Sequence, residues 1–208
     1  MRAVVFDLDG TLIDAAPDIT AVLNRQLAAD ILPALTVAEV RGMIGDGAQA
    51  LLARAFSARG AVAEPRHLAG FIADYQENPV RETVCYPGIE AALASLRAEG
   101  RQLGICTNKP IGPTRGILDA LGLTPYFAAI IGGDSTPYKK PDPRHLAAVL
   151  AEMEVASAIM VGDHHNDLAA AAGLGQDAVF VTWGYGVASG THVASTAQEL
   201  LLRIAEIG

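Results

Sequence analysis

The 208-residue sequence predicts an α/β fold, a doubly wound parallel sheet with a small helical cap inserted after its first strand. Three observations predict this fold. Short apolar runs recur along the chain, helical patterns separate most of them, and one long stretch near the N-terminus shows helical periodicity alone. We expect residues 1–14 and 80–208 to form the core domain, and residues 15–79 to form the cap domain.

The expected strands are short and almost continuously apolar, which is typical of parallel strands covered by helices on both faces. They are Ala3–Phe6, Leu103–Thr107, Ala128–Ile131, Ala158–Val161 and Ala178–Thr182.

Apolar stripes at helical spacing lie between and after these strands. One stripe ends at Gly100, a residue type that commonly follows the last turn of a helix. The stripes are Ile89, Leu93 and Leu96; Leu146, Val149, Leu150 and Met153; and Leu200, Leu201 and Ile204.

The stretch from about Ala15 to Pro79 contains no run that resembles a strand. Pro17 is well placed to begin a helix, and a second helix is expected after Gly45-Asp46-Gly47. The apolar faces are Ile19, Val22, Leu23 and Leu27, and Leu51, Leu52 and Phe56. Ligands of open α/β sheets bind at the carboxyl ends of the strands, where this insertion begins. We therefore interpret it as a cap; the alternative is a helical extension packed away from any site.

Composition and charge limit the classes of function. The net charge of −8 argues against a nucleic-acid partner, because binding a phosphate backbone relies on clustered lysine and arginine. A small phosphorylated substrate remains possible, since a metal ion and one or two lysines reverse the potential locally. No apolar run approaches the roughly 20 residues of a membrane span. The apolar run before Asp7 is too short for a signal peptide. Cys85 and Cys106 are expected to be reduced buried thiols, as in a cytoplasmic protein.

Polar clusters follow four of the predicted strands, the third of them through a loop. Because parallel strands point the same way, these clusters are expected to converge on one edge of the sheet. The clusters are Asp7–Thr11, Thr107–Lys109, Tyr138–Pro143 and Gly162–Asp167.

The convergence would crowd at least three carboxylates, those of Asp7, Asp9 and Asp163. Like charges at close range repel each other, so either some are protonated or a cation is present. An incomplete set of hard oxygen ligands suits Mg²⁺, which keeps waters and binds substrate phosphate. Lys140 supplies a point charge for a phosphate oxygen or for the nucleophile.

The spacing of the first acidic pair predicts phosphoryl chemistry. One carboxylate can attack phosphorus and form an aspartyl-phosphate. The other can protonate the leaving alcohol and later deprotonate the water that cleaves the intermediate. Thr107 and main-chain N–H groups are expected to hold the remaining oxygens, while Lys140 and the metal offset their charge.

Each motif alone has a structural interpretation. Asp-x-Asp-Gly is compatible with a turn, Lys-Pro-Asp-Pro with a rigid loop, and Asp163 and Asp167 with charges that favour a helix N-terminus. Asp142 is interpreted in this last way. The four motifs together, in order and each after a strand, favour one functional site.

The four motifs resemble those of the haloacid dehalogenase superfamily, specifically its phosphatases with a helical cap after the first motif. The resemblance implies that Asp7 is nucleophile and metal ligand, and that Asp9 is the general acid and base and lends its main-chain carbonyl to Mg²⁺. It implies that Asp163 completes the metal site and that Asp167 supports it from outside the ligand set. Thr107, Asn108 and Lys140 would bind phosphate. Dehalogenase members lack the second acid, so Asp9 favours phosphate chemistry.

Several further stretches are similar to bacterial phosphoglycolate phosphatases: Ile44–Gly47, Tyr86–Ile89, Leu103–Pro110, Gly132–Asp134 and Lys139–Pro141. This similarity implies a hydrolase for a small phosphorylated acid such as 2-phosphoglycolate. Alternatives are a phosphatase for pyrophosphate, a sugar phosphate or a nucleoside monophosphate, and a phosphomutase. A non-catalytic binding domain is disfavoured by the stability cost of crowded carboxylates. Monomer and homodimer are both open.

Some residues depart from the family pattern or have open roles. His164 stands where a small hydroxyl residue is usual, and His164-His165 is not read as a zinc site because adjacent side chains diverge. Lys140, rather than Lys139, is assigned the phosphate role because it precedes Pro141. Gly45 and Gly47 either bring N–H groups close to an anionic substrate or only turn the chain. Arg41 or Arg54 is a candidate charge partner for that substrate.

Overall fold

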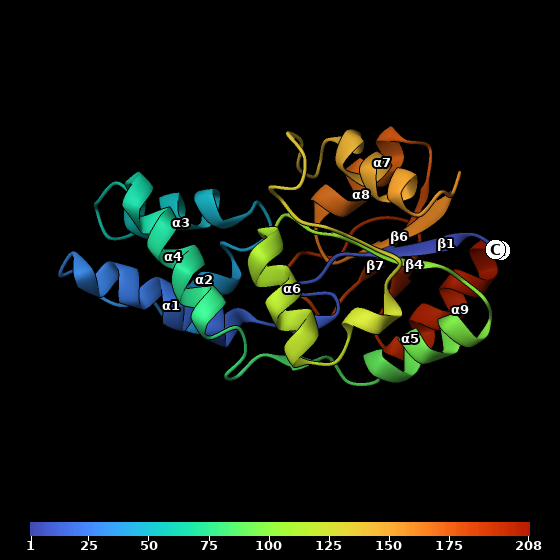
Figure 1. Ribbon diagram of the computed structural model, residues 1–208, viewed down its shortest axis with the longest axis horizontal. Coiled ribbons are helices and arrows are strands. Elements are labelled where there is room, and N and C mark those ends of the chain that lie inside the picture. Colours follow the sequence, from blue (N-terminus) through green and yellow to red (C-terminus); the bar gives the residue numbers. More distant parts are fainter.

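The computed structural model describes all 208 residues and contains one six-stranded parallel sheet with the strand order β5-β4-β1-β6-β7-β8 (Figure 1). The predicted α/β fold is confirmed, and each of the five expected strands is present to within one residue at either end. The strands are β1 (Ala3–Phe6), β4 (Leu103–Cys106), β5 (Ala129–Ile131), β6 (Ala158–Gly162), β7 (Asp177–Val181) and β8 (Val193–Ala194).

Helices cover both faces of the sheet, and alternate residues of each strand pack on opposite sides. Val4 and Phe6 of β1 belong to one apolar cluster and Val5 to another. The larger cluster packs against α5 (Ile89–Ala98), α6 (Ile111–Ala120) and α9 (Ala197–Ile207), and the smaller against α7 (Pro143–Glu152) and α8 (His165–Gly173). Figure 1 shows α7 and α8 above the sheet and α5 and α9 below it.

Local sequence explains where several of these helices begin and end. Asp142 accepts a hydrogen bond from the main-chain N–H of Arg144 and caps α7, as predicted. Gly100 follows α5 with a φ of 82°, the left-handed conformation that glycine adopts without strain. A short 3₁₀ helix, η1 (Thr124–Tyr126), precedes β5.

The segment between β1 and α5 contains four helices, which form a separate layer beside the sheet (Figure 1). They are α1 (Ala16–Ala29), α2 (Val37–Arg41), α3 (Ala48–Ser57) and α4 (Pro65–Glu77). Pro17 lies in the first turn of α1, and Thr36 and Glu39 form a reciprocal cap at the start of α2. Their apolar side chains, including Leu23 and Phe56, continue the larger cluster of the core.

Two connections join this helical layer to the sheet. They pair as a short antiparallel ribbon of β2 (Ile13–Asp14) and β3 (Val84–Cys85). A two-residue strand is too short to show alternation, so neither was expected from the sequence. The connections place the helical layer over the carboxyl end of β1.

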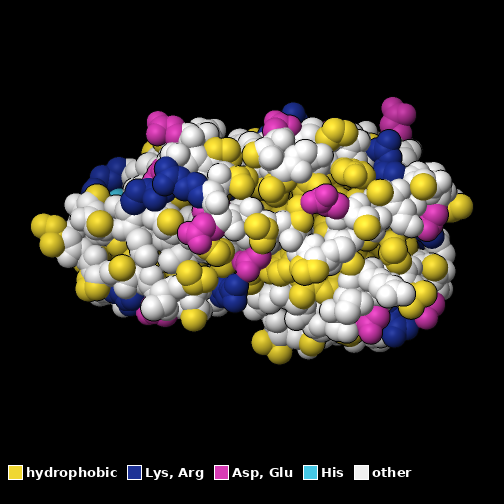
Figure 2. Space-filling view, turned by 90° about the horizontal axis from the view of Figure 1, so that it is seen from below, with side chains coloured by type: hydrophobic (Ala, Val, Ile, Leu, Met, Phe, Trp, Pro, Cys, Tyr) yellow, Lys and Arg dark blue, Asp and Glu magenta, His cyan; other side chains and the backbone are white.

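The remaining expectations concern the surface, the thiols and the helix lengths. On the face shown in Figure 2, acidic and basic side chains are interspersed with apolar ones rather than gathered by sign. Cys85 and Cys106 are both free thiols; Cys106 is buried, as predicted, whereas Cys85 is only half-buried. None of the helices combines the length and the apolar character needed to cross a lipid bilayer.

Candidate active site

Five of the predicted site residues meet at the carboxyl edge of the sheet. Asp7 directly follows β1, Thr107 follows β4 and Asp163 follows β6. Asp167 lies in the first turn of α8, and Lys140 lies in the loop before α7. All five side chains are buried, so their charges act at close range in an environment that screens them weakly.

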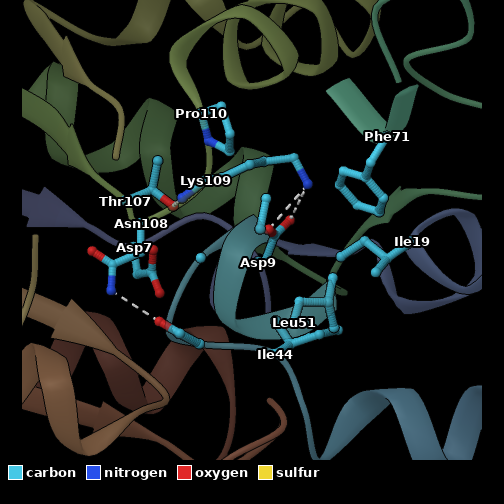
Figure 3. A pocket seen from close by; sticks show the side chains of 13 residues that line it. Asp7, Asp9, Ile19, Ile44, Leu51, Phe71, Thr107, Asn108, Lys109 and Pro110 are labelled. Carbon is cyan, nitrogen blue, oxygen red and sulfur yellow. Dashed lines mark hydrogen bonds and ion pairs between the residues drawn. The ribbon is translucent and has the colours of Figure 1, made fainter. Parts of the chain in front are cut away.

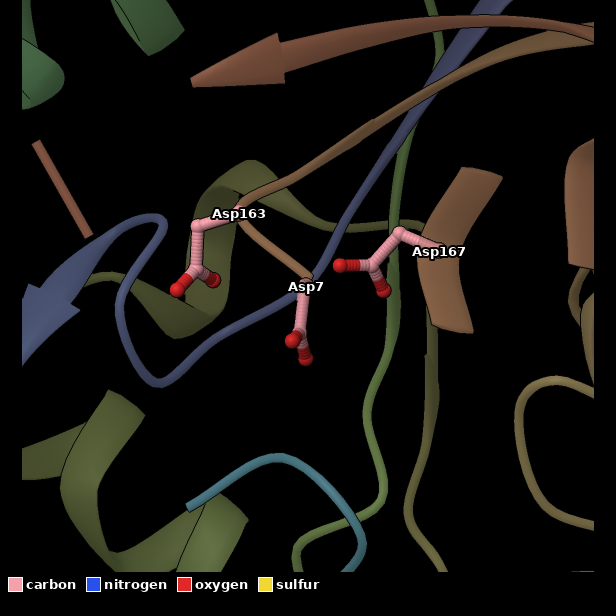
Figure 4. Close-up of side chains that lie close together, drawn as sticks. All are labelled: Asp7, Asp163 and Asp167. Carbon is pink, nitrogen blue, oxygen red and sulfur yellow. The ribbon is translucent and has the colours of Figure 1, made fainter. Parts of the chain in front are cut away.

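Three of these residues form an acidic group. One carboxylate oxygen from each of Asp7, Asp163 and Asp167 lies within 4.8 Å of the others, and Figure 4 shows Asp7 between the other two. The ammonium of Lys140 lies 2.9 Å from Asp7 Oδ1 and 2.6 Å from Asp167 Oδ1. A single lysine therefore bridges the nucleophile expected from the sequence and its supporting acid.

The acidic group carries more negative charge than Lys140 offsets. Burial, and then the neighbouring Asp7 carboxylate, raise the pKa of Asp163 to about 6. Burial works against the charge on Lys140, but the carboxylates of Asp167 and Asp7 outweigh it and raise the lysine pKa. A further cation would relieve this imbalance, and buried carboxylate oxygens in an incomplete set are the donors that Mg²⁺ prefers. The residues present therefore fit a magnesium ion between Asp7 and Asp163.

Two loops hold Asp163 in place. The Thr11 hydroxyl donates to Asp163 Oδ1 at 3.0 Å, and the main-chain N–H of Tyr185 donates to Oδ2 at 2.8 Å. Gly10 has a φ of 83°, and a Cβ there would lie 2.3 Å from Asp163 Oδ2, so only glycine fits. The contact of Tyr185 with Asp163 was not predicted from the sequence. The Gly184-Tyr185-Gly186 run after β7 was the one local feature that pointed to a special loop there.

Asp9 is turned away from the acidic group. Its two carboxylate oxygens lie 3.1 and 3.3 Å from the ammonium of Lys109 (Figure 3). Burial raises the pKa of Asp9, against the opposing effect of Lys109. The side chain is thus outside the expected set of metal ligands, and only the main-chain carbonyl of Asp9 remains for that purpose.

The side-chain amide of Asn108 is fully used within the chain. Its amide nitrogen donates to the carbonyl oxygens of Gly45 and Lys140 at 2.9 Å each, and its amide oxygen accepts from the Lys140 N–H. The side chain therefore ties the loop of Lys140 to the helical layer and has no donor left for phosphate. The main-chain N–H groups of Asn108 and Asp9 donate to no acceptor within the chain and remain available.

A small cavity of about 40 Å³ lies between the core and the helical layer (Figure 3). Its polar wall is formed by Asp7, Asp9, Thr107, Asn108 and Lys109 of the core, and its apolar wall by Ile19, Ile44, Leu51 and Phe71. Drug-sized ligand pockets occupy roughly 300–1,000 Å³, so this cavity is too small for a drug-sized ligand in the closed arrangement. Both parts of the chain are needed to close it.

The two arginines suggested as charge partners do not reach the cavity. Arg41 pairs with Asp14 at 2.7 Å, and Arg54 pairs with Asp46. Neither lines the cavity, because each is held by an acidic residue close to it. The suggestion that Arg41 or Arg54 pairs with a substrate in this cavity is therefore wrong for the arrangement seen here.

The two adjacent histidines lie beside the acidic group without belonging to it. His164 Nδ1 accepts a hydrogen bond from the main-chain N–H of Asn166 and caps α8, and the ring of His165 contacts it in a tilted arrangement with the ring centroids 4.1 Å apart. Asn166 in turn donates to Asp46 at 2.7 Å. His164 therefore caps α8 at the position where the resemblance led us to expect a small hydroxyl residue.

Comparison with known proteins decides the family. The family model of haloacid dehalogenase-like hydrolases matches residues 1–175. The chain belongs to this family.

Relatives and solved structures are similar over almost the whole chain. A phosphoglycolate phosphatase of Cereibacter sphaeroides is 45% identical over 189 residues, which are 89% of this chain and 87% of that protein. One from Rhodospirillum rubrum is 43% identical over 194 residues, covering 88% of this chain and 80% of that protein. The crystal structure of a predicted phosphoglycolate phosphatase from Haemophilus somnus superposes with a TM-score of 0.89, at 28% identity and 97% coverage of both chains. The predicted family and the predicted enzyme class, a phosphatase, are confirmed.

Proposed function

We propose that this chain is a magnesium-dependent phosphomonoester hydrolase that acts through an aspartyl-phosphate, with 2-phosphoglycolate as its substrate. One observation carries the proposal: Asp7, directly after β1, lies against Lys140 and Asp163 and lines a small cavity together with Asp9. The names of the relatives at 45% and 43% identity support the choice of substrate.

In the first step, a carboxylate oxygen of Asp7 attacks phosphorus while the bond from phosphorus to the ester oxygen breaks. The electron pair of that bond goes to the leaving oxygen, which takes a proton from Asp9. Burial favours the protonated form of Asp9 and so suits it to this role. Lys140 orients Asp7 and places a positive charge beside it through their 2.9 Å contact.

In the second step, Asp9 takes a proton from water, and the water oxygen attacks phosphorus. The bond from phosphorus to Asp7 breaks, which releases inorganic phosphate and restores the Asp7 carboxylate and the protonated form of Asp9. In this proposal the Thr107 hydroxyl and the free main-chain N–H groups of Asp9 and Asn108 hold the other phosphoryl oxygens, since these residues line the cavity. Asp7, Asp163 and the main-chain carbonyl of Asp9 would hold Mg²⁺, which supplies positive charge to the phosphoryl group when bound.

The helical layer acts as a cap in this proposal. Residues 15–79 form the cap domain and residues 1–14 and 80–208 the catalytic core, since the apolar wall of the cavity comes mainly from the helices. Closing the cap excludes water from the phosphoryl group and surrounds the leaving group. The cytoplasmic location and the choice between monomer and homodimer stay predictions.

The test is phosphate release by the purified chain. With 2-phosphoglycolate and Mg²⁺, we expect inorganic phosphate to appear, which a phosphomutase would not produce. Activity should disappear with a chelator and return with Mg²⁺ rather than Zn²⁺, and Ca²⁺ should inhibit because of its larger coordination shell. Full activity in metal-free buffer would contradict the metal requirement. A higher kcat/KM for pyrophosphate, a sugar phosphate or a nucleoside monophosphate would contradict the substrate.

A further inference from the structure

Lys109 is the only cationic side chain that lines the cavity. It is buried, with 8% of its surface exposed, and its ammonium lies 3.1 Å from Asp9 Oδ2. Burial works against its charge, but Asp9 and Tyr75 outweigh that effect and raise the lysine pKa. The cavity therefore contains one permanent positive charge beside the expected general acid.

The cap covers this ammonium. Its nitrogen lies 4.2 Å from the centre of the Tyr75 ring of α4, a distance typical of a cation–π contact. Phe71, one turn earlier in the same helix, lines the cavity next to it (Figure 3). The Tyr75 hydroxyl is buried and has no hydrogen-bond partner, which leaves a polar group unsatisfied in this part of the cap.

We propose that Lys109 binds an anionic group on the leaving portion of the substrate and so selects phosphorylated acids over phosphorylated alcohols and amides. This inference rests on the proposed function, because it uses Asp9 as the group that protonates the leaving oxygen.

The placement of Asp9 and Lys109 gives the reason. If the leaving oxygen lies beside Asp9, the next substituent of the leaving group lies beside the ammonium that contacts Asp9. In a phosphorylated α-hydroxy acid, a single carbon separates the ester oxygen from the carboxylate. The two functional groups of such a substrate therefore match the two adjacent side chains, and a charged hydrogen bond forms at each end.

No other cationic side chain lines the cavity. Arg41 and Arg54 are held by Asp14 and Asp46, and Lys140 is enclosed by Asp7 and Asp167. The rest of the cavity wall near the cap is apolar and would leave a carboxylate unpaired. Selection for an anionic leaving group thus depends on one residue.

Binding of the substrate carboxylate also changes the position of Asp9. Before binding, the two oxygens of Asp9 occupy one side of the ammonium, and the Tyr75 ring occupies another. A substrate carboxylate competes with Asp9 for the ammonium and releases Asp9 toward the leaving oxygen. The charge that identifies the substrate thereby also frees the acid that it needs.

The test compares 2-phosphoglycolate with its amide, 2-phosphoglycolamide, which has the same shape and no carboxylate charge. In the intact protein, kcat/KM should be higher for the acid. Lys109→Met should lower kcat/KM for the acid by about 100-fold and for the amide by less than about 10-fold, because only the acid loses a charged contact. Lys109→Arg should retain the preference for the acid.

Two further variants keep the result interpretable. Lys139→Met removes an exposed lysine near the same cap loop and should leave the preference unchanged. Lys109→Gln keeps a donor for Asp9 and should lose the preference even if Lys109→Met does not fold. Two outcomes would show that the inference about Lys109 is wrong. In the first, the parent protein prefers the acid and both neutral variants keep that preference. In the second, the neutral variants lower kcat/KM equally for the acid and the amide. If the parent protein itself shows no preference for the acid, both the proposed substrate and the inference about Lys109 are wrong.

Discussion

Lys140 is the residue on which the electrostatics of the site depend. It is buried between Asp7 and Asp167, and no other cation contacts the acidic group. Gly162 allows this arrangement, since a Cβ there would lie 2.1 Å from Asp167 Oδ2. The lysine places one positive charge between two buried carboxyl groups, and one of them is the proposed nucleophile.

Replacing Lys140 should therefore damage both stability and activity. Lys140→Met leaves the acidic group without a partner and should lower the free energy of unfolding by about 3–5 kcal/mol in metal-free buffer. It should lower kcat by about 100- to 1,000-fold, as expected when one group that offsets phosphoryl charge is removed. Urea unfolding and phosphate release measure the two effects. Lys139→Met, an exposed neighbour, serves as the control; a Lys140→Met protein as stable as its parent would contradict this electrostatic account.

The sequence predicted residues whose roles follow from strand ends, and missed those whose roles follow from tertiary contacts. Asp7, Thr107 and Asp163 follow directly from apolar runs, so their meeting could be expected. Two contacts could not be expected in this way, because they join distant segments. The Asn108 amide donates to Gly45 of the cap, and the Lys109 ammonium lies over the Tyr75 ring of the cap. No local pattern records such contacts.

At the scale of elements, Asp18 fixes the return of the chain from the cap to the core. It lies in the first turn of α1 and accepts hydrogen bonds from the main-chain N–H groups of Arg81, Glu82 and Thr83, at 2.9 to 3.1 Å, and from the Thr83 hydroxyl at 2.6 Å. Burial alone would raise the pKa of Asp18, but these hydrogen bonds outweigh it and lower the pKa. The ionised carboxylate is therefore a structural part of the connection.

Asp18→Asn should destabilise the protein in a pH-dependent way. The amide has one acceptor oxygen instead of two, and we expect a loss of about 1–3 kcal/mol at pH 7. Because the folded pKa is lowered, the stabilisation by Asp18 is complete above the ordinary value of about 4 and is lost as the pH falls through the folded value. Urea unfolding of parent and variant at neutral and acidic pH measures this. A difference that does not shrink in acid would show that ionisation of Asp18 is unimportant.

The cap loop Gly45–Gly47 joins the cap to the core in the closed arrangement. Asn108 donates to Gly45, and a Cβ on Gly47 would lie 2.9 Å from the carbonyl oxygen of Asn108. Gly47→Val should push the loop away and lower kcat/KM for 2-phosphoglycolate by at least about tenfold more than for 4-nitrophenyl phosphate, whose leaving group depends less on cap closure.

A matched control exists for this variant. Gly60 also lies in the cap and has a φ of 71°, but a Cβ there meets nothing within 4 Å. Gly60→Val should therefore bring similar backbone strain without changing the ratio of the two substrates. Equal losses on both substrates in Gly47→Val would mean that the loop only turns the chain.

Several elements that the sequence did not predict depend on tertiary contacts. β2, β3 and β8 are two residues long and exist only because a partner strand is present. The helix α6 contains Gly112, Pro113 and Gly116, which lower its intrinsic helix propensity. It forms because Ile117 and Leu118 are buried in the larger apolar cluster.

At the scale of the whole molecule, the two parts divide the chemistry. The carboxyl edge of the sheet supplies every group proposed to act on the phosphoryl group, which all candidate substrates share. The helical layer supplies most of the apolar wall around the leaving group, where substrates differ. The order of elements predicted a core and a cap, but only the folded chain shows that their contact encloses a cavity with one cation.

The most direct test of the central claim is to trap the phosphoryl group on Asp7. Asp9→Asn should still react with 4-nitrophenyl phosphate, whose leaving group needs no proton, but should hydrolyse the intermediate slowly because it lacks the base. After acid quenching, borohydride reduction of an aspartyl-phosphate yields homoserine, which mass spectrometry of the Asp7 peptide locates. We predict homoserine at position 7, and none when Asp7→Asn is added. Release of 4-nitrophenol with Asp7 unmodified, or a phosphoryl group on another side chain, would contradict the account.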